Sequence, residues 1–248
     1  MSRIYIDNTT YIFVLLSLLS GYFEYVILVY MFIIIHELGH LIAASFMHFK
    51  IDKIYIYPLG GITKYNEIIN VNIYKELFVL VCGPLVQIFF CLILKKLYLL
   101  NLININKYLM IKQINYFLLS FNLLPISLLD GGRLINIIFD FIFPYKKSYY
   151  YTLVISIIII VSTVYLKHNL LIILCLIFLI KNNIIEFTKF KYRYNKFLLE
   201  RLIYNLNIRK SNKVIIFDNI KRNISKNILY KDKVYTEKEF LNRIYFKY

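Results

Sequence analysis

Long apolar runs separated by short polar or charged segments dominate this sequence. They lie near residues 10–23, 25–48, 77–98, 108–126, 149–166 and 169–185. Most of these runs approach the roughly 20 residues that a helix needs to cross the hydrocarbon core of a bilayer. A segment in lipid must satisfy its own backbone hydrogen bonds, and an α-helix does so. The pattern therefore predicts an all-α polytopic membrane protein with about six transmembrane helices.

A different pattern separates the second run from the third. The stretch 51–68 reads IDKIYIYPLGGITKYNEI, and its Ile and Tyr residues precede Pro58, Gly60 and Gly61. β-Branched and aromatic residues favour strands, whereas proline and glycine mark turns. A simple connecting turn also fits this stretch. We expect a short membrane-associated β-hairpin between spans two and three.

Composition supports the membrane assignment and adds a basic C-terminal segment. The chain is 60% hydrophobic with a mean hydropathy of +0.62. Residues 181–248 hold 17 Lys and Arg against 6 Asp and Glu, a surplus of 11 positive charges. Basic segments beside spans usually lie in the cytoplasm and contact anionic lipid headgroups. We therefore expect a membrane domain over 1–186 and a small basic cytoplasmic tail over 187–248 that lacks strand–helix alternation. No nucleic-acid motif accompanies the charge, so nucleic acid is not an expected partner.

Candidate chemistry lies in the second apolar run, where His36-Glu37-Leu38-Gly39-His40 forms an HExxH motif. Residues four apart share one face of a helix, so both imidazoles can bind one metal ion while Glu37 acts on water there. A charge at the centre of a bilayer helix costs about 2.5–3.5 kcal/mol. Three ionisable residues in one turn therefore favour a functional site over a polar patch that only binds neighbouring helices. Imidazole ligands suit a catalytic zinc that keeps one position open for water.

A third ligand has to come from another segment, and Asp130 is the candidate. It lies in NLLPISLLDGG at 122–132, where Pro125 interrupts the fourth apolar run. Backbone groups freed at such a break must be buried in protein or face a cavity. The alternative is that Asp130 only caps a helix over 133–143. Both roles are compatible with one carboxylate.

The pairing of HELGH with NLLPISLLDGG resembles the site-2 protease family of intramembrane zinc metalloproteases, and the arrangement is most similar to its sporulation group. The resemblance covers residues 10–185, with Gln87 where many relatives have Asn. It implies that Zn²⁺ is the cofactor and that Glu37 is the general base. It further implies zinc ligands and residues that shape the site or bind substrate. These are His36, His40 and Asp130 as ligands, and Asn122, Pro125, Gly60 and Gly61 around them.

The same resemblance implies a substrate class and partners. The substrate would be a membrane-associated regulatory protein, a pro-sigma factor during sporulation, with the tail on the mother-cell side of the membrane. Membrane inhibitor proteins would be further partners. The alternatives are an anti-sigma factor or another membrane protein as substrate, a membrane metal transporter, or a non-catalytic scaffold. Relatives in the sporulation group often end in a nucleotide-sensing CBS domain, for which the tail is short.

Overall fold

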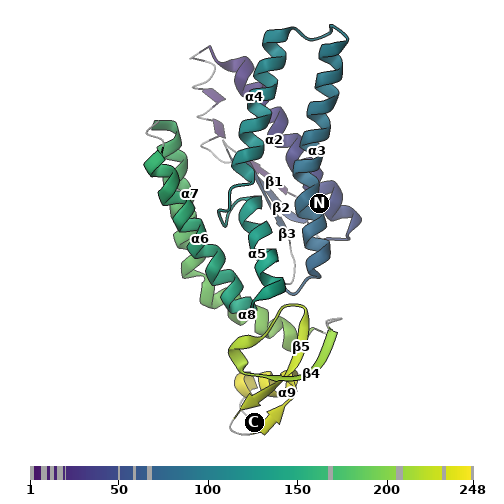
Figure 1. The fold of residues 1–248 in the computed structure, drawn as a ribbon, viewed down its shortest axis with the longest axis vertical. Coiled ribbons are helices and arrows are strands. Elements are labelled where there is room, and N and C mark those ends of the chain that lie inside the picture. The colour runs from purple at the N-terminus through teal and green to yellow at the C-terminus, as the bar shows by residue number, and fades with distance from the viewer. Residues whose placement is uncertain are drawn as a thin grey trace. The chain divides into compact units, whose positions relative to one another are not determined.

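The computed structural model describes residues 3–6, 10–11, 14–15, 19, 21–49, 51–57, 60–65, 69–166, 170–204, 209–230 and 233–246. The chain forms two compact units. The first, here called the N-terminal unit, comprises Met1–Glu67 and Tyr74–Asn122. The second, the C-terminal unit, comprises Ile68–Ile73 and Leu123–Tyr248. Figure 1 labels most elements of both units.

Three long helices form most of the N-terminal unit: α2 (Phe23–Phe46), α3 (Ile73–Leu99, of which only Ile73 falls outside the unit) and α4 (Ile105–Asn122). A core of Leu28, Phe32, Ile33, Ile111, Ile114 and Leu118 joins α2 to α4. Both α2 and α3 are long and apolar enough to cross a membrane. The outward side of α3 is itself apolar, since Leu85 is 55% exposed and Phe89 is 65% exposed. Such a face suits contact with lipid better than contact with water.

A three-stranded sheet completes the N-terminal unit. Strand β1 (Arg3–Ile6) pairs parallel with β2 (Ile51–Tyr57), and β2 pairs antiparallel with β3 (Gly60–Tyr65). The expected hairpin is therefore confirmed, although Pro58 and Leu59 lie outside the described residues. The sequence pattern did not predict β1, because a strand so short is recognised only through its partner.

The C-terminal unit begins with helices and ends with a second sheet. Its helices are α5 (Asp130–Ile142), α6 (Tyr145–Leu166), α7 (Leu170–Thr188) and α8 (Phe190–Ile203). Strand β4 (Arg209–Ile215), the short helix η1 (Phe217–Asn219) and strands β5 (Ile224–Tyr230) and β6 (Lys233–Tyr235) follow, and α9 (Glu237–Phe246) ends the unit. Strand β5 is central, parallel to β4 and antiparallel to β6.

The prediction of an all-α protein is confirmed only in that the chain is mostly helical, because it also contains two three-stranded sheets, and six transmembrane helices are not confirmed. Two described helices, α2 and α3, meet the length and hydropathy expected of a span, while α4, α6 and α7 overlap three further expected spans. The expected first span at 10–23 lies largely outside the described residues.

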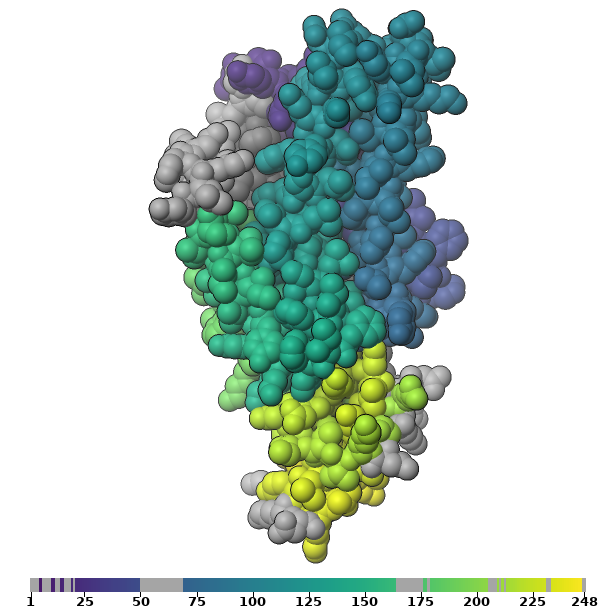
Figure 2. Space-filling view, in the orientation of Figure 1, coloured from purple at the N-terminus to yellow at the C-terminus, as the bar shows by residue number. Residues whose placement is uncertain are grey.

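The prediction of a tail without strand–helix alternation is wrong. Residues after 189 fold as α8, three strands and α9. Figure 2 shows the yellow C-terminal end of the chain as a packed body. Their core contains Phe197, Leu198, Ile220, Ile228, Phe240 and Leu241. Lys and Asn separate these apolar residues along the chain, so the core is visible only after the strands have paired.

Candidate metal centre

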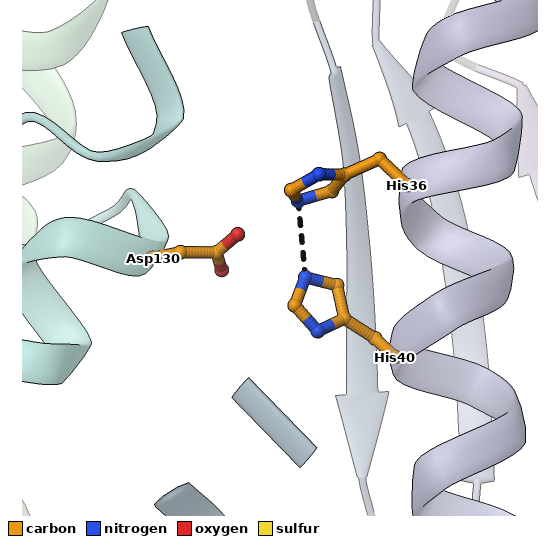
Figure 3. A group of neighbouring side chains, drawn as sticks. All are labelled: His36, His40 and Asp130. Carbon is orange, nitrogen blue, oxygen red and sulfur yellow. Dashed lines mark hydrogen bonds between the residues drawn. The ribbon is translucent and has the colours of Figure 1, made fainter. Parts of the chain in front are cut away.

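Two histidines lie one turn apart on the buried side of α2. His36 is 2% exposed and His40 is 6% exposed. Their Nε2 atoms are 3.1 Å apart, and their ring planes are inclined at 80°. Figure 3 shows the two imidazoles turned toward each other. The HExxH spacing thus produces the shared face that the sequence predicts.

The other nitrogen of each ring is held by a residue of α3. His36 Nδ1 lies 2.8 Å from Gln87 Oε1, and His40 Nδ1 lies 3.0 Å from the carbonyl oxygen of Val79. The Gln87 amide is oriented from its far side, where Nε2 donates to the carbonyl oxygen of Asn115 at 3.3 Å. Because a carbonyl only accepts, Gln87 must present its own oxygen to His36.

These contacts assign the tautomer of both rings. Each Nδ1 faces an acceptor, so each Nδ1 carries the hydrogen. In the neutral rings both Nε2 atoms then carry lone pairs, and neither can donate to the other across 3.1 Å. A cation bound to the Nε2 atoms relieves this repulsion. Neutral imidazoles with Nδ1–H held by an acceptor and Nε2 left for the ion are the usual form of histidine ligands. The pair therefore fits a metal ion such as zinc.

Close packing of α2 against α3 depends on two glycines. A Cβ at Gly83 would lie 2.3 Å from His40 Nε2, and a Cβ at Gly39 would lie 2.7 Å from the carbonyl oxygen of Cys82. Both distances are far below van der Waals contact. Gly83 therefore leaves the space that the His40 ring occupies, and Gly39 lets α3 come near enough to supply acceptors to both rings.

Glu37 follows His36 directly and is partly buried. Its place in the motif is the one expected of a group that acts on water at the metal. It shares the turn of α2 that the two histidines occupy.

Asp130 is the first residue of α5 and is partly buried (Figure 3). The expected helix over 133–143 instead spans Asp130–Ile142, with Leu129 at the N-cap, so Asp130 is not the capping residue. Gly131 and Gly132 hold this turn against the preceding loop. A Cβ at either one would meet a backbone carbonyl oxygen, that of Leu123 or Ile126, at 2.1 Å. The DGG sequence thus places a carboxylate at a tightly packed helix start.

The remaining predicted site residues lie in three places. Asn122 ends α4, and Pro125 lies in the loop before α5, where its carbonyl oxygen accepts a hydrogen bond from Ser156 Oγ at 3.4 Å. Gly60 and Gly61 open β3 and pair with Tyr57 and Ile56. All four are described, and their roles in substrate binding stay predictions.

Sequence reasoning did not assign the two residues that support His36. Gln87 was noted only as a departure from the pattern of the relatives, and Asn115 was not singled out. A signal was available, because a polar side chain inside an apolar helix needs a hydrogen-bonding partner. The sequence could not say that Gln87 and Asn115 are partners.

Comparisons with known proteins find similarity to a family of peptidases. Residues 24–102 match Peptidase family M50. The chain is 29% identical over 147 residues to stage IV sporulation protein FB of Bacillus subtilis, covering 59% of this chain and 51% of that protein. It is 34% identical over 125 residues to a zinc metalloprotease of Methanocaldococcus jannaschii, covering 49% of this chain and 36% of that protein. The chain therefore spans about half the length of the first relative and about a third of the second.

A solved structure is similar over a larger share of the chain. The site-2 protease from Methanocaldococcus jannaschii matches with a TM-score of 0.58 and 28% sequence identity, over 75% of this chain and 91% of that one. The resemblance inferred from the two motifs is thereby confirmed.

Proposed function

We propose that this chain, which carries a Peptidase M50 domain of the site-2 protease type, is an intramembrane zinc metalloendopeptidase. The observation that carries the proposal is the buried histidine pair, whose Nδ1 atoms face acceptors on α3 and whose Nε2 atoms face each other. A structural pair would gain nothing from opposing two lone pairs. A metal site requires that arrangement.

The proposed ligands are His36, His40 and Asp130. Two neutral imidazoles and one carboxylate form a donor set that suits zinc and leaves the fourth position for water. The assignment of Asp130 as a ligand is supported by its place at the start of α5, where Gly131 and Gly132 fix the backbone against the preceding loop. Asp140, which is the other aspartate of α5, is occupied by an ion pair with Arg222.

The chemistry follows from these residues. Zinc, when bound, supplies Lewis-acid activation of water and of the peptide carbonyl. Glu37 accepts the proton of the attacking water and passes it to the leaving amine nitrogen. Gln87 and Val79 keep each histidine in the tautomer that presents Nε2 to the ion.

The substrate would be held as an extended strand. A helix hides its peptide bonds in internal hydrogen bonds, so a transmembrane substrate has to unwind before cleavage. In the described part of the sheet β3 is an outer strand, since it pairs only with β2. Such an edge can add a peptide by backbone hydrogen bonding. Gly60 and Gly61 at its start would let the peptide approach closely, while Asn122 and Pro125 would shape the site beside the metal.

Proline substitutions in β3 test this part of the proposal. Successive residues of an edge strand present their N–H groups alternately to the neighbouring strand and outward. Of Ile62→Pro and Thr63→Pro, one therefore breaks the β2 ladder and the other removes only an outward donor. We expect the outward variant to keep its fold and lose cleavage. Unchanged cleavage by both variants would contradict the strand-addition model.

The similarity to stage IV sporulation protein FB favours a membrane-associated pro-sigma factor as the substrate. An anti-sigma factor or another membrane protein is the alternative substrate. The surplus of positive charge after residue 180 supports a cytoplasmic C-terminus, on the mother-cell side in a sporulating cell. A membrane inhibitor protein is the further partner that this assignment implies.

The deciding experiment is co-expression of the full chain with a candidate membrane-associated pro-sigma factor. Processing is followed by immunoblot for wild type and for Glu37→Gln, and bound zinc is measured in both purified proteins. We expect about one zinc per chain in each protein and processing by wild type alone. Equal processing by both would contradict the mechanism. Metal uptake into vesicles that survives Glu37→Gln, without proteolysis, would instead indicate a transporter.

A further inference from the structure

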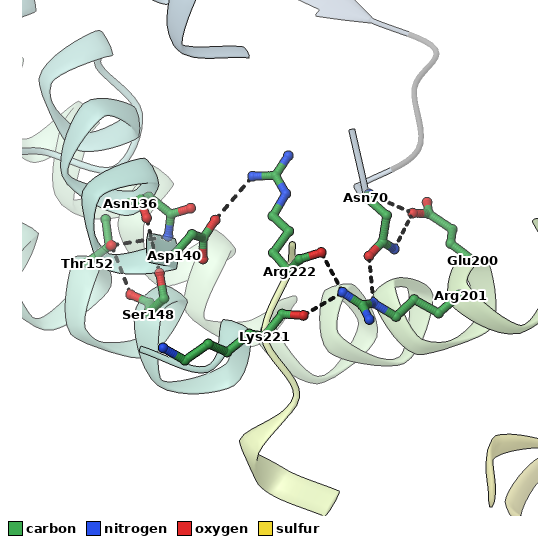
Figure 4. A network of polar contacts seen from close by, with 9 residues as sticks. All are labelled: Asn70, Asn136, Asp140, Ser148, Thr152, Glu200, Arg201, Lys221 and Arg222. Carbon is green, nitrogen blue, oxygen red and sulfur yellow. Dashed lines mark hydrogen bonds and ion pairs between the residues drawn. The ribbon is translucent and has the colours of Figure 1, made fainter. Parts of the chain in front are cut away.

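The segment 220–222, which leads into β5, is bonded to the end of α5 and the start of α6. The carbonyl oxygen of Ile220 accepts from the Tyr145 amide at 3.0 Å. Lys221 Nζ donates to the carbonyl oxygen of Ile142 at 2.6 Å, and Arg222 Nη1 donates to Asp140 Oδ2 at 3.1 Å. Figure 4 shows Lys221 and Arg222 reaching toward these helices. Lys221 and Arg222 thus hold the C-terminal end of α5, and Ile220 bonds to the start of α6.

Two of these contacts involve charged groups in surroundings that strengthen their electrostatic interaction. The Asp140 and Arg222 side chains are 0% and 6% exposed, so their ion pair is shielded from solvent and salt. Removing one partner would take away the ion-pair partner of a buried charge, which is costly. The Lys221 ammonium meets a carbonyl in the last turn of α5, where unpaired carbonyls and the helix dipole both favour a cation.

Arg201 of α8 holds the segment 220–222 from its other side. Its Nη2 donates to the carbonyl oxygens of Lys221 and Arg222, and its Nη1 donates to Glu237 Oε1 at 2.8 Å. The Arg201 and Glu237 side chains are 2% and 5% exposed. Burial lowers the pKa of the Arg201 guanidinium, and the Glu237 carboxylate opposes that shift. We call Arg201 and the residues bonded to it the arginine hub. These residues are Asn70, Lys221, Arg222, Ile224 and Glu237.

The arginine hub also holds the chain that enters α3. Asn70 Oδ1 accepts from Arg201 Nε at 3.0 Å, and Asn70 Nδ2 donates to the carbonyl oxygen of Phe197 at 3.0 Å. Asn70 lies just before α3, which begins at Ile73 and supplies both acceptors for the histidines. Figure 4 shows Asn70 beside Arg201 and Glu200.

Helix α5 joins this held end to Asp130. Asp140 lies ten residues from Asp130, which is about 15 Å along a helix. Midway along α5, two polar contacts of Asn136 fix this helix against α6. Asn136 Nδ2 donates to Thr152 Oγ1 at 3.2 Å, and Ser148 Oγ donates to the Asn136 carbonyl oxygen at 3.1 Å. A rotation or slide of the held end would therefore move the Asp130 carboxylate.

We propose that Arg222 is a positioning residue for Asp130, acting through its buried ion pair with Asp140 on the same helix. The inference rests on the proposed function, because it takes Asp130 as a metal ligand. The C-terminal sheet is then part of the protease: the arginine hub orders 220–222, and Arg222 and Lys221 fix the axis and rotation of α5. Asp130 meets the metal only when that end is held.

Cobalt binding to the purified full-length chain in detergent tests the proposal, because the visible spectrum of Co²⁺ reports the number and geometry of its ligands. The variants are Arg222→Met, Arg222→Lys, Asp140→Asn and Asp130→Asn. The matched control is Asp218→Asn, which breaks the Lys146–Asp218 pair at 3.0 Å between η1 and α6, where the side chains are 39% and 57% exposed. Far-UV circular dichroism at low temperature reports the fold of each variant.

We expect Arg222→Met and Asp140→Asn to weaken Co²⁺ binding by about tenfold, as loss of a supporting contact to a ligand does, and to shift the spectrum toward that of Asp130→Asn. Arg222→Lys should give an intermediate effect, and Asp218→Asn should match wild type. A double variant that combines Arg222→Met with Asp140→Asn should bind Co²⁺ no more weakly than either single variant, since both substitutions break the same ion pair.

If the folded Arg222 and Asp140 variants have the Co²⁺ affinity and spectrum of wild type while Asp130→Asn is impaired, the positioning role of Arg222 is overturned. The proposed metal site would stand in that case. Wild-type binding by Asp130→Asn would instead contradict Asp130 as a ligand, and with it the proposed metal site. If Arg222→Met does not fold, Arg222→Lys and Asp140→Asn decide between these outcomes.

Discussion

The histidine pair of α2 and the arginine hub of the C-terminal unit both bury polar groups, but they satisfy them in different ways. In the hub, all five N–H groups of Arg201 meet acceptors: Asn70 Oδ1, Glu237 Oε1 and the carbonyl oxygens of Lys221, Arg222 and Ile224. In the pair, the outer nitrogens of the rings meet acceptors, whereas the inner nitrogens point lone pairs at each other. Every N–H group of Arg201 thus has an acceptor, whereas the facing Nε2 atoms of the two neutral rings have no hydrogen to share between them.

We infer that this difference separates a structural cluster from the proposed metal site. Burial by itself did not distinguish them, because both are nearly inaccessible to solvent. The distinction comes from counting donors and acceptors. A buried guanidinium whose N–H groups all meet acceptors stabilises the fold, whereas two opposed lone pairs favour a bound cation. The following predictions test each side of this comparison.

Removing the charge of the hub should have the largest effect. Arg201→Met leaves Glu237 buried without its partner, and such a loss typically costs about 3–5 kcal/mol of unfolding free energy. We expect the C-terminal sheet to become sensitive to protease at temperatures where wild type resists. The control is Arg193→Met, since Arg193 is 43% exposed in its pair with Glu186 and should contribute less than about 1 kcal/mol. Equal resistance of Arg201→Met and wild type would show that the hub is not needed for stability.

Filling the space beside His40 should have the next largest effect. The Cβ of Gly83→Ala would lie 2.3 Å from His40 Nε2, so the ring or the helix must shift. A displacement of about 1 Å near the reacting groups can cost about a hundredfold in rate. Zinc content and reporter cleavage measure the loss. Cys82→Ala alters the neighbouring residue of α3 and should retain both, and a fully active Gly83→Ala would refute the tight packing.

Removing the acceptor for His36 should have a moderate effect. Gln87→Leu keeps a side chain of similar length but leaves Nδ1–H of His36 without its 2.8 Å contact. Loss of such a partner typically costs about 10–100-fold in metal affinity. Competition with a zinc chelator measures the change. Asn115→Ala should have a smaller effect in the same direction, because it orients Gln87 and does not touch the ring. Identical zinc affinities in all three proteins would refute the supporting role.

A change in the cap of α9 should have the smallest effect and should depend on pH. Thr236 and Glu239 form a capping box, in which the Thr236 amide donates to Glu239 Oε2 at 3.0 Å and the Glu239 amide donates to Thr236 Oγ1 at 3.4 Å. The bond from the Thr236 amide, and then the one through its side chain, lowers the pKa of Glu239.

The sign of that pH dependence follows from the lowered pKa. The contribution of Glu239 to stability is present above its unfolded pKa, and it is lost as the pH falls through the lower folded value. Thr236→Ala should therefore reduce the melting temperature of the C-terminal unit slightly at neutral pH, with a difference that narrows below about pH 4. A difference that widens in acid would contradict this assignment.

The histidine motif and the DGG segment could be recognised from the sequence because each is local. Once the segment is helical, the spacing of four residues in HExxH places both imidazoles on one face. The hairpin over 51–68 was predictable for a similar reason, since strand-forming residues flank a proline and two glycines. The tail was not, because its core residues are scattered among lysines and asparagines and meet only after β4, β5 and β6 pair.

The sequence alone was enough to propose which residues bind a metal and which one moves a proton, because these proposals follow from side-chain type and helical spacing. Tertiary structure decided the rest. Gln87 and Val79 lie far from the histidines in the chain, and only the close packing of α2 on α3 turns them into the acceptors that set the tautomers. Likewise Asp140 and Arg222 read as ordinary charged residues until folding buries them together at 3.1 Å. Contacts between distant segments carry no local pattern, so packing alone assigns these residues their roles.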